Sequence, residues 1–211
     1  MSRRVLALVA GGVVLVAVVA VVALTSLGGG RGRSLAPEAA AGQVRAVQPN
    51  VTLIPEGRRK PIPALAGETL DGSMLDLASA RGSVLVLNFW GSWCGPCRSE
   101  QPGLQLAAAQ LAGKGVRFVG VDVRDQRAAA LAYEREFKTS YPSLYDPSAA
   151  LTARLGDQAP SFQPATLVVD QQGRVGATIT GAVNGGQGSA ALQAGLLADV
   201  VARVGGTGAG K

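Results

Sequence analysis

The chain alternates between short apolar runs and longer segments with helical periodicity. Residues 83–90, "SVLVLNFW", are an apolar run rich in β-branched and aromatic side chains, which is typical of a strand buried on both faces of a sheet. A helix is predicted to follow from Cys94 through Ala112, with Pro96 near its first turn, where proline is tolerated. The cysteine-containing segment "WCGPC" is therefore expected at a junction between a strand and a helix.

The same alternation continues toward the C-terminus. The pattern predicts strands at 115–123, 143–146, 165–170 and 174–180, and helices at 126–140, 147–156 and 189–206. Earlier in the chain, residues 64–77 hold Asp71-Gly72 between short half-apolar runs, which predicts a β-hairpin. Strands that alternate with helices indicate an α/β fold with a mixed central sheet flanked by helices.

A long uncharged segment lies close to the N-terminus. A helix needs about 20 apolar residues to cross a bilayer, and residues 5–27 contain no charged side chain, so they are predicted to be a transmembrane anchor behind a short tail, residues 1–4. A cleaved signal peptide is the alternative. Its apolar core runs about 7–15 residues and ends at an A-x-A-like site, whereas Ala23-Leu24-Thr25 is a poor cleavage site.

The segment after this run has no periodicity. Residues 28–60 combine glycine, alanine and charge and end in proline, glycine and a basic triplet, so they are predicted to be a flexible linker. The folded domain is then expected over residues 61–206, with a loose tail at residues 207–211.

The positive net charge is confined to the first part of the chain. The whole chain carries +6, with eight Lys or Arg and two acidic residues in 1–60, and twelve of each sign in 61–211. The predicted domain is therefore neutral and offers no basic stripe that could follow phosphates, so nucleic acid is not expected as a partner. The excess cations suit anionic lipid headgroups near the predicted anchor.

Cys94 and Cys97 are the only cysteines, and three roles are open to them. A structural zinc site needs four Cys or His ligands, and the chain has two Cys and no His, which leaves only a dimer that shares four sulfurs. A structural disulfide would close only a four-residue loop and contribute roughly 2 kcal/mol by the chain-entropy estimate. Neither metal nor cofactor is expected.

A redox-active dithiol fits the pattern best. Residues at i and i+3 lie on one side of a helix, with Cα atoms about 5 Å apart, which suits an unstrained disulfide. Cys94 is expected at the helix N-terminus, where free N–H groups and the helix dipole stabilise a thiolate. Because the thiolate attacks, Cys94 is predicted to be the nucleophile and Cys97, one turn deeper, the resolving thiol.

The stretch "LNFWGSWCGPCRSEQP", residues 87–102, resembles the thioredoxin superfamily, which carries Trp-Cys-Gly-Pro-Cys after a buried strand. Within it the chain is most similar to the membrane-anchored extracytoplasmic thiol–disulfide oxidoreductases of the TlpA/ResA/CcmG type, through the Asp71-Gly72 hairpin and residues 141–156 and 163–175. The resemblance covers about residues 62–204. It implies a thioredoxin-like fold with an N-terminal hairpin and a central insertion.

The resemblance also assigns supporting residues. Gly95 and Pro96 are the two residues between the cysteines in thioredoxin. Pro164 matches the family's cis-proline, whose loop faces the cysteines and pairs with substrate backbone; a trans proline opening the next strand is the alternative. Trp93 is expected either to shield the disulfide or to belong to the core.

One position departs from thioredoxin. Asn88 stands where thioredoxin has a buried aspartate, so no carboxylate is expected there to move the proton of the resolving thiol. Asn88 either senses the dithiol or is simply satisfied by backbone groups. Glu100 is a candidate substitute for the aspartate, but an exposed helical glutamate is the favoured interpretation.

The resemblance implies a membrane-tethered oxidoreductase with its domain outside the cytoplasm. Its expected partners are disulfides of exported proteins, a transmembrane thiol-electron carrier as donor, and the membrane through residues 5–27. The expected direction is reduction, and an apocytochrome c in cytochrome c maturation is a candidate substrate. The alternatives are a disulfide oxidase or isomerase on the same fold, and a non-enzymatic tethered binding or chaperone module.

Overall fold

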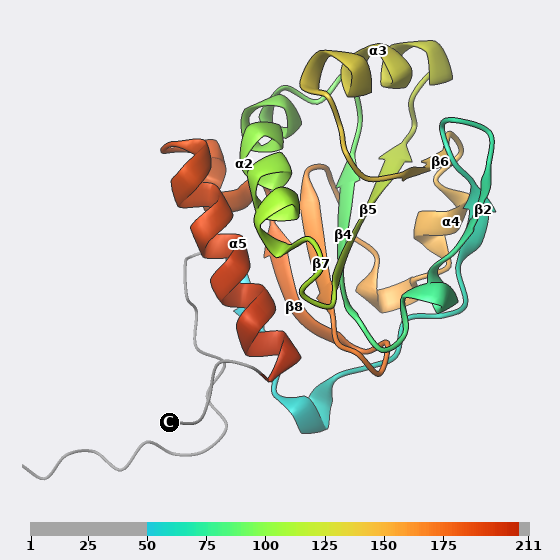
Figure 1. Ribbon diagram of the computed structural model, residues 1–211. Helices are drawn as coiled ribbons and strands as arrows, with labels where there is room; N and C mark the ends of the chain where they lie inside the picture. The colour runs from blue at the N-terminus through green and yellow to red at the C-terminus, as the bar shows by residue number, and fades with distance from the viewer. Residues whose placement is uncertain (1–49, 207–211) are drawn as a thin grey trace, which may run out of the picture. The chain divides into compact units, whose positions relative to one another are not determined.

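A computed structural model describes residues 50–206 of the protein. The α-helices are α2 (Gly95–Leu111), α3 (Arg127–Phe137), α4 (Ala150–Ala153) and α5 (Ala190–Gly205), and the strands are β1 (Val51–Leu53), β2 (Ala66–Glu68), β3 (Met74–Asp76), β4 (Val84–Trp90), β5 (Val116–Val123), β6 (Ser143–Asp146), β7 (Ala165–Val169) and β8 (Val175–Thr180). Short 3₁₀ turns are η1 (Glu56–Arg58), η2 (Leu77–Ala80), η3 (Gly156–Gln158) and η4 (Val183–Gly186). Figure 1 shows the helices flanking a central sheet.

Six strands form the central sheet in the order β1-β8-β7-β4-β5-β6. Strands β4, β5 and β6 are parallel, whereas β7 runs antiparallel to β4 and β8 and β1 continue in antiparallel fashion. Strand β4 is buried along its whole length because it lies between β5 and β7 with elements over both faces. The C-terminal end of β4 therefore lies in the middle of the sheet, at the edge formed by the C-terminal ends of the parallel strands. The two cysteines follow directly after it in the chain.

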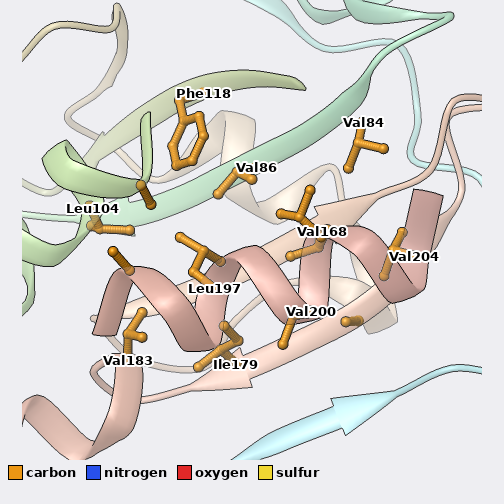
Figure 2. Packing of buried hydrophobic residues seen from close by; sticks show 14 of the residues in the cluster. Val84, Val86, Leu104, Phe118, Val168, Ile179, Val183, Leu197, Val200 and Val204 are labelled. Atoms are coloured by element: carbon orange, nitrogen blue, oxygen red, sulfur yellow. The ribbon is translucent and has the colours of Figure 1, made fainter. Parts of the chain in front are cut away.

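Helices α2 and α5 pack on one face of the sheet. Figure 2 shows Leu197, Val200 and Val204 of α5 lying against Val86 of β4 and Val168 of β7. Burying an aliphatic side chain of this size contributes about 1.5–3 kcal/mol. This packing fixes α2 and α5 side by side, and α2 carries both cysteines at its start.

The opposite face is covered by the N-terminal hairpin segment and by the insertion that contains α4. Leu87 and Phe89 of β4 pack there with Leu77 of η2 and Leu155 beyond α4. Because side chains of a strand alternate between faces, Val86, Asn88 and Trp90 point toward the α2 face instead.

The predicted thioredoxin-like α/β fold is confirmed, with its mixed sheet, N-terminal hairpin and central insertion. The hairpin turns at Gly72, whose φ of 88° is a left-handed conformation that glycine adopts without strain. The helix predicted over 147–156 is shorter than expected, since α4 spans only Ala150–Ala153 and continues as the 3₁₀ turn η3.

The linker expected over residues 28–60 extends too far. Val51–Leu53 form the edge strand β1, which pairs with β8, and Arg59 donates hydrogen bonds to the Asp170 carboxylate at 3.1 Å and to the Val204 carbonyl at 3.0 Å. Three residues are too few for a strand pattern to be visible in the sequence, and the basic triplet suggested exposure.

Several expectations fall outside the described residues. These are the N-terminal tail 1–4, the anchor 5–27, the linker up to residue 49 and the tail 207–211. Within residues 50–206, every helix is too short or too polar to cross a bilayer.

Candidate active site

Cys94 and Cys97 form a disulfide at the N-terminus of α2. Cys94 is the N-cap residue, and its Sγ accepts a hydrogen bond from the Cys97 backbone N–H at 3.2 Å. The Cα atoms are 5.3 Å apart, which confirms the distance expected from helix geometry. Gly95 and Pro96 form the exposed first turn over the sulfurs. No three His, Cys, Asp or Glu side chains within residues 50–206 are grouped to hold a metal ion.

Both cysteines are more buried than a surface helix start suggests. Only 4% of Cys94 and 1% of Cys97 is exposed, so access to Cys94 is narrow. Tyr133 of α3 covers Cys97 by donating its hydroxyl hydrogen to the Cys97 carbonyl at 3.0 Å, and it stacks on Trp90 with ring centroids 4.4 Å apart. Burial raises the pKa of Tyr133, so its hydroxyl stays a donor.

Trp93 lies on the surface beside the disulfide. Its side chain is 55% exposed, so the alternative role in the core is wrong. The indole Nε1 donates to the Val123 carbonyl at 3.3 Å, which turns the ring back over Gly91. A Cβ at position 91 would lie 2.5 Å from Nε1 of this ring, so a larger residue there would push the indole away from the backbone. The shielding of the disulfide by Trp93 stays a prediction.

Pro164 has the predicted cis peptide bond with Gln163. It immediately precedes β7, whose first residue, Ala165, pairs with Phe89 near the end of β4. Because β4 leads to Cys94 and β7 begins at the same sheet edge, the Pro164 loop and the disulfide share that edge. This edge is called the redox edge below.

Asn88 belongs to a buried polar network under the cysteines. Its side-chain Nδ2 donates to Glu100 Oε1 at 2.9 Å and to Thr166 Oγ1 at 3.1 Å. The other Glu100 oxygen accepts the backbone N–H of Val183 at 2.7 Å. The interpretation of Glu100 as an exposed helical glutamate is wrong, because only 1% of it is exposed. A carboxyl group is thus present beside Asn88 after all, supplied by α2.

Glu100 ionises close to neutral pH. Burial raises its pKa to about 7, although the hydrogen bonds from Val183 and Asn88 oppose this shift because they favour the carboxylate. A carboxyl group with such a pKa can accept and release protons under physiological conditions. Glu100 follows Cys97 by one helical turn and therefore lies on the same side of α2 as Cys97.

Sequence reasoning missed Tyr133 and misjudged Glu100, although a pattern for each was present. Cys97, Glu100 and Leu104 are spaced three and four residues apart, which marks the buried stripe of α2. Ala130, Tyr133 and Phe137 have the same spacing on α3 and pack at the cysteines or beside them. The charge of Glu100 concealed the first pattern because a glutamate is rarely buried.

Two cavities flank the segment that leads to Pro164. One of about 250 Å³ is lined by Val123, Arg124 and Gln163 and therefore lies at the redox edge. A larger one of about 350 Å³ is lined by Ile54, Phe162, Ala165 and other residues, and neither cysteine is part of the wall of either cavity.

Comparisons with known proteins agree with this geometry. The model of the Redoxin family matches residues 52–194. The thiol-disulfide oxidoreductase ResA of Bacillus cereus is 26% identical over 122 residues, which are 58% of this chain and 69% of that protein. The thiol:disulfide interchange protein DsbE of Yersinia pestis is 36% identical over 118 residues, which are 54% of this chain and 59% of that protein.

Solved structures give the same result. A DsbF homologue from Corynebacterium diphtheriae has a TM-score of 0.62 and 32% identity, and the match covers 77% of this chain and 99% of that one. A secreted thiol-disulfide isomerase from Corynebacterium glutamicum has a TM-score of 0.58 and 34% identity, with 64% of this chain and 84% of that chain covered. With its Cys94–Cys97 pair at the start of α2, the chain belongs to the Redoxin family and is a thioredoxin-like thiol–disulfide oxidoreductase.

Proposed function

We propose that the protein is a membrane-tethered reductase that acts on disulfides of exported proteins outside the cytoplasm. The main observation behind this proposal is that the two cysteines differ. Cys94 caps α2, whereas Cys97 is fully enclosed and is followed one turn later by the ionisable carboxyl group of Glu100. The names of the relatives ResA and DsbE support thiol–disulfide exchange, and the similarity to a secreted thiol-disulfide isomerase supports a place outside the cytoplasm. The uncharged run at residues 5–27 supports the tether.

The reduction proceeds in two exchanges. The Cys94 thiolate attacks one sulfur of the substrate disulfide, so that a mixed disulfide forms and the second substrate sulfur leaves as a thiolate. The Cys97 thiol then loses its proton to the Glu100 carboxylate and attacks Cys94 Sγ, which releases the first substrate sulfur. The substrate gains two electrons, and the protein is left with the Cys94–Cys97 disulfide.

The disulfide must be reduced again before the next turnover. A transmembrane thiol-electron carrier supplies the two electrons at the redox edge in this proposal. The Cys-X-X-Cys-His segment of an apocytochrome c is the proposed substrate, because its two cysteines form a short-range disulfide that must be open before haem attachment.

A disulfide oxidase or isomerase is the second candidate function. The similarity to a secreted thiol-disulfide isomerase favours it, because the same exchange runs in either direction.

The reduction potential of the Cys94–Cys97 couple separates the two functions. The full chain is equilibrated in glutathione or dithiothreitol buffers of known potential, and the fraction of disulfide is measured by thiol labelling. A reductase should give a value near the roughly −270 mV of thioredoxin, whereas values above about −180 mV would indicate an oxidase or isomerase. Reduction of a disulfide-bonded Cys-X-X-Cys-His peptide by the reduced protein then tests the substrate.

A further inference from the structure

The tip of the N-terminal hairpin, residues 69–73, is partly buried in the domain. Only 2% of Thr69 and 3% of Leu70 is exposed. Thr69 pairs with Leu144 in an isolated bridge, and the Leu70 N–H donates to the Ser143 carbonyl at 2.9 Å, so the tip lies along β6 (Figure 1). Connecting segments usually run over the protein surface, so a buried tip needs partners from other elements for its backbone groups.

Arg127, the first residue of α3, is such a partner. Its Nη1 donates to the carbonyl oxygens of Thr69 and Leu70, both at 2.9 Å. Its Nη2 lies 3.0 Å from the Glu68 carboxylate, and its guanidinium carbon lies 4.3 Å from the centre of the Tyr145 ring. Within residues 50–206, Arg127 is the single donor to the Leu70 carbonyl, so removing this side chain would leave that group without a partner. Arg127 therefore fastens the tip to α3.

Leu70 brings the tip into the group of side chains that encloses the cysteines. Its side chain belongs to one buried apolar cluster with Cys94, Cys97, Trp90, Ala130 and Tyr133. Trp90 ends strand β4, which is paired with a strand on each side, whereas Leu70 belongs to a turn. Segments with few hydrogen bonds open locally at a lower free energy than core strands. The tip is therefore the part of this enclosure that opens with the least disturbance of the sheet.

The enclosure matters because thiol exchange needs access to a sulfur. Only 4% of Cys94 and 1% of Cys97 is exposed in the disulfide state. An attacking thiolate has to reach one of the two sulfurs to form a mixed disulfide, and the rate depends on that access. A wall of the enclosure has to move before a bulky thiol can react.

We propose that the hairpin tip is the movable wall of the cysteine enclosure and that Arg127 sets how often this wall opens. Arg127 is then a positioning residue, because it acts through Leu70 rather than on the sulfurs. While the tip is closed, thiols in solution reach the Cys94–Cys97 disulfide slowly. The inference goes beyond the proposed reductase function, since a closed wall limits exchange in either direction.

Reduction of the oxidised full chain by dithiothreitol tests the role of Arg127. The protein is kept in detergent micelles at about 0.5 M salt, where exposed charges are largely screened, and free thiols are measured after an acid quench by maleimide labelling and mass spectrometry. Arg127→Met loses both hydrogen bonds to the tip, so reduction should be about tenfold faster than in wild type. Arg135→Met is the matched control, because it removes an exposed arginine of the same helix and should leave the rate unchanged.

A second variant tests the wall without changing Arg127. Leu70→Ala shortens the side chain that the tip contributes to the cluster, while both carbonyl groups keep their donor. It should also speed reduction by dithiothreitol. Met74→Ala is its control, because Met74 directly follows the tip, is 74% exposed and lies outside the cluster. Wild-type reduction rates in both Arg127→Met and Leu70→Ala would overturn the proposal.

Hydrogen exchange separates a local opening from a general loss of stability. In Arg127→Met the Leu70 amide, which is bonded to the Ser143 carbonyl, should exchange faster by a larger factor than the amides of β4. Equal acceleration at the tip and in β4 would contradict a movable wall. These measurements use no substrate protein and no physiological redox partner, so the proposed reductase function can fail while the role of Arg127 is confirmed, and the reverse is equally visible.

Discussion

At the scale of single residues, the two cysteines differ in backbone position. Cys94 precedes the first helical turn and receives the Cys97 N–H on its sulfur, whereas Cys97 lies within the helix under Tyr133. Hydrogen bonds to a thiolate lower its pKa and favour attack. Cys97→Ser should therefore accumulate mixed disulfides with substrates, and Cys94→Ser should not. Non-reducing electrophoresis checks this, and equal trapping by both variants would contradict the assignment.

Glu100 should make the stability of the protein depend on pH. Its pKa in the folded state is raised to about 7, so the folded protein binds a proton more tightly than the unfolded chain. The free energy of unfolding should then fall as pH rises from about 4.5 to about 7, by about 3 kcal/mol in total, and stay level above that. Glu100→Gln should flatten this region in urea unfolding measured at successive pH values.

The glutamine is expected to fit at position 100. Its oxygen can accept the Val183 N–H, and its amide can donate to Asn88 Oδ1, which has no donor within the described residues. Glu136→Gln on α3 is the control, because that side chain is exposed and its ion pair within residues 50–206 is with Arg98. A Glu100→Gln variant that kept the wild-type slope would show that another group titrates.

Asn88→Asp tests whether position 88 is coupled to Glu100. The substitution places a second carboxyl group against Glu100 Oε1, where Asn88 now donates at 2.9 Å. The two acids would share one proton, so stability should fall more steeply with rising pH than in wild type and be lower by about 3 kcal/mol at pH 8. The double variant Asn88→Asp/Glu100→Gln should recover most of the loss. Superimposable pH–stability curves for wild type and Asn88→Asp would rule out the coupling.

Residues with a strong local pattern could be predicted, and residues fixed by tertiary packing could not. Cys94, Cys97 and the cis bond at Pro164 follow from the motif and from the resemblance it supports. The burial of Glu100 depends on Val183, which is far away in the chain and reaches α2 only in the folded structure. Charge alone favoured a solvated side chain, and the tertiary hydrogen bonds reversed that preference.

At the scale of elements, the strands and helices with long apolar patterns were predicted within a few residues. Strands β4 and β5 are examples, since burial on both faces of the sheet gives them mostly apolar sequences. Strand β1 was missed because three residues carry too little pattern, and its partner β8 supplies the pairing. The short α4 is preceded by Ala149, an N-cap residue in a left-handed conformation that no sequence rule for helix starts anticipates.

Arg59 should stabilise the packing of the segment after β1, residues 54–60, against the rest of the domain. Its guanidinium bonds the buried Asp170 carboxylate and the Val204 carbonyl at the end of α5. Arg59→Met removes these two hydrogen bonds and a third from Nε to the Ile54 carbonyl, and it should destabilise the protein by about 2 kcal/mol in urea unfolding. Lys60→Met is the matched control, because its pair with Asp157 is exposed and should contribute nothing measurable. If the two variants were equally stable, Arg59 would not hold its segment to the domain, and residues 59 and 60 would belong to the linker.

At the scale of the whole molecule, the charge distribution supports a tethered domain. The cations in excess lie in the first 60 residues, around the uncharged run at residues 5–27, while the rest is neutral. We expect the mature protein to keep this run and to fractionate with membranes. N-terminal sequencing of protein from the native host checks it, and a mature start near Ser26 or Gly28 would make it a secreted, soluble form.

The two ends of the described chain leave the domain at opposite edges of the sheet. Asn50 bonds to the Thr180 N–H and the Ala182 carbonyl, beside the redox edge, whereas Gly205 lies against Val84 at the start of β4. An affinity tag, dye or bead coupled beyond residue 206 therefore leaves the disulfide open to large protein partners. The same attachment just before residue 50 would lie on the side of the disulfide and hinder the approach of those partners. Immobilised assays of this oxidoreductase should be built on its C-terminus.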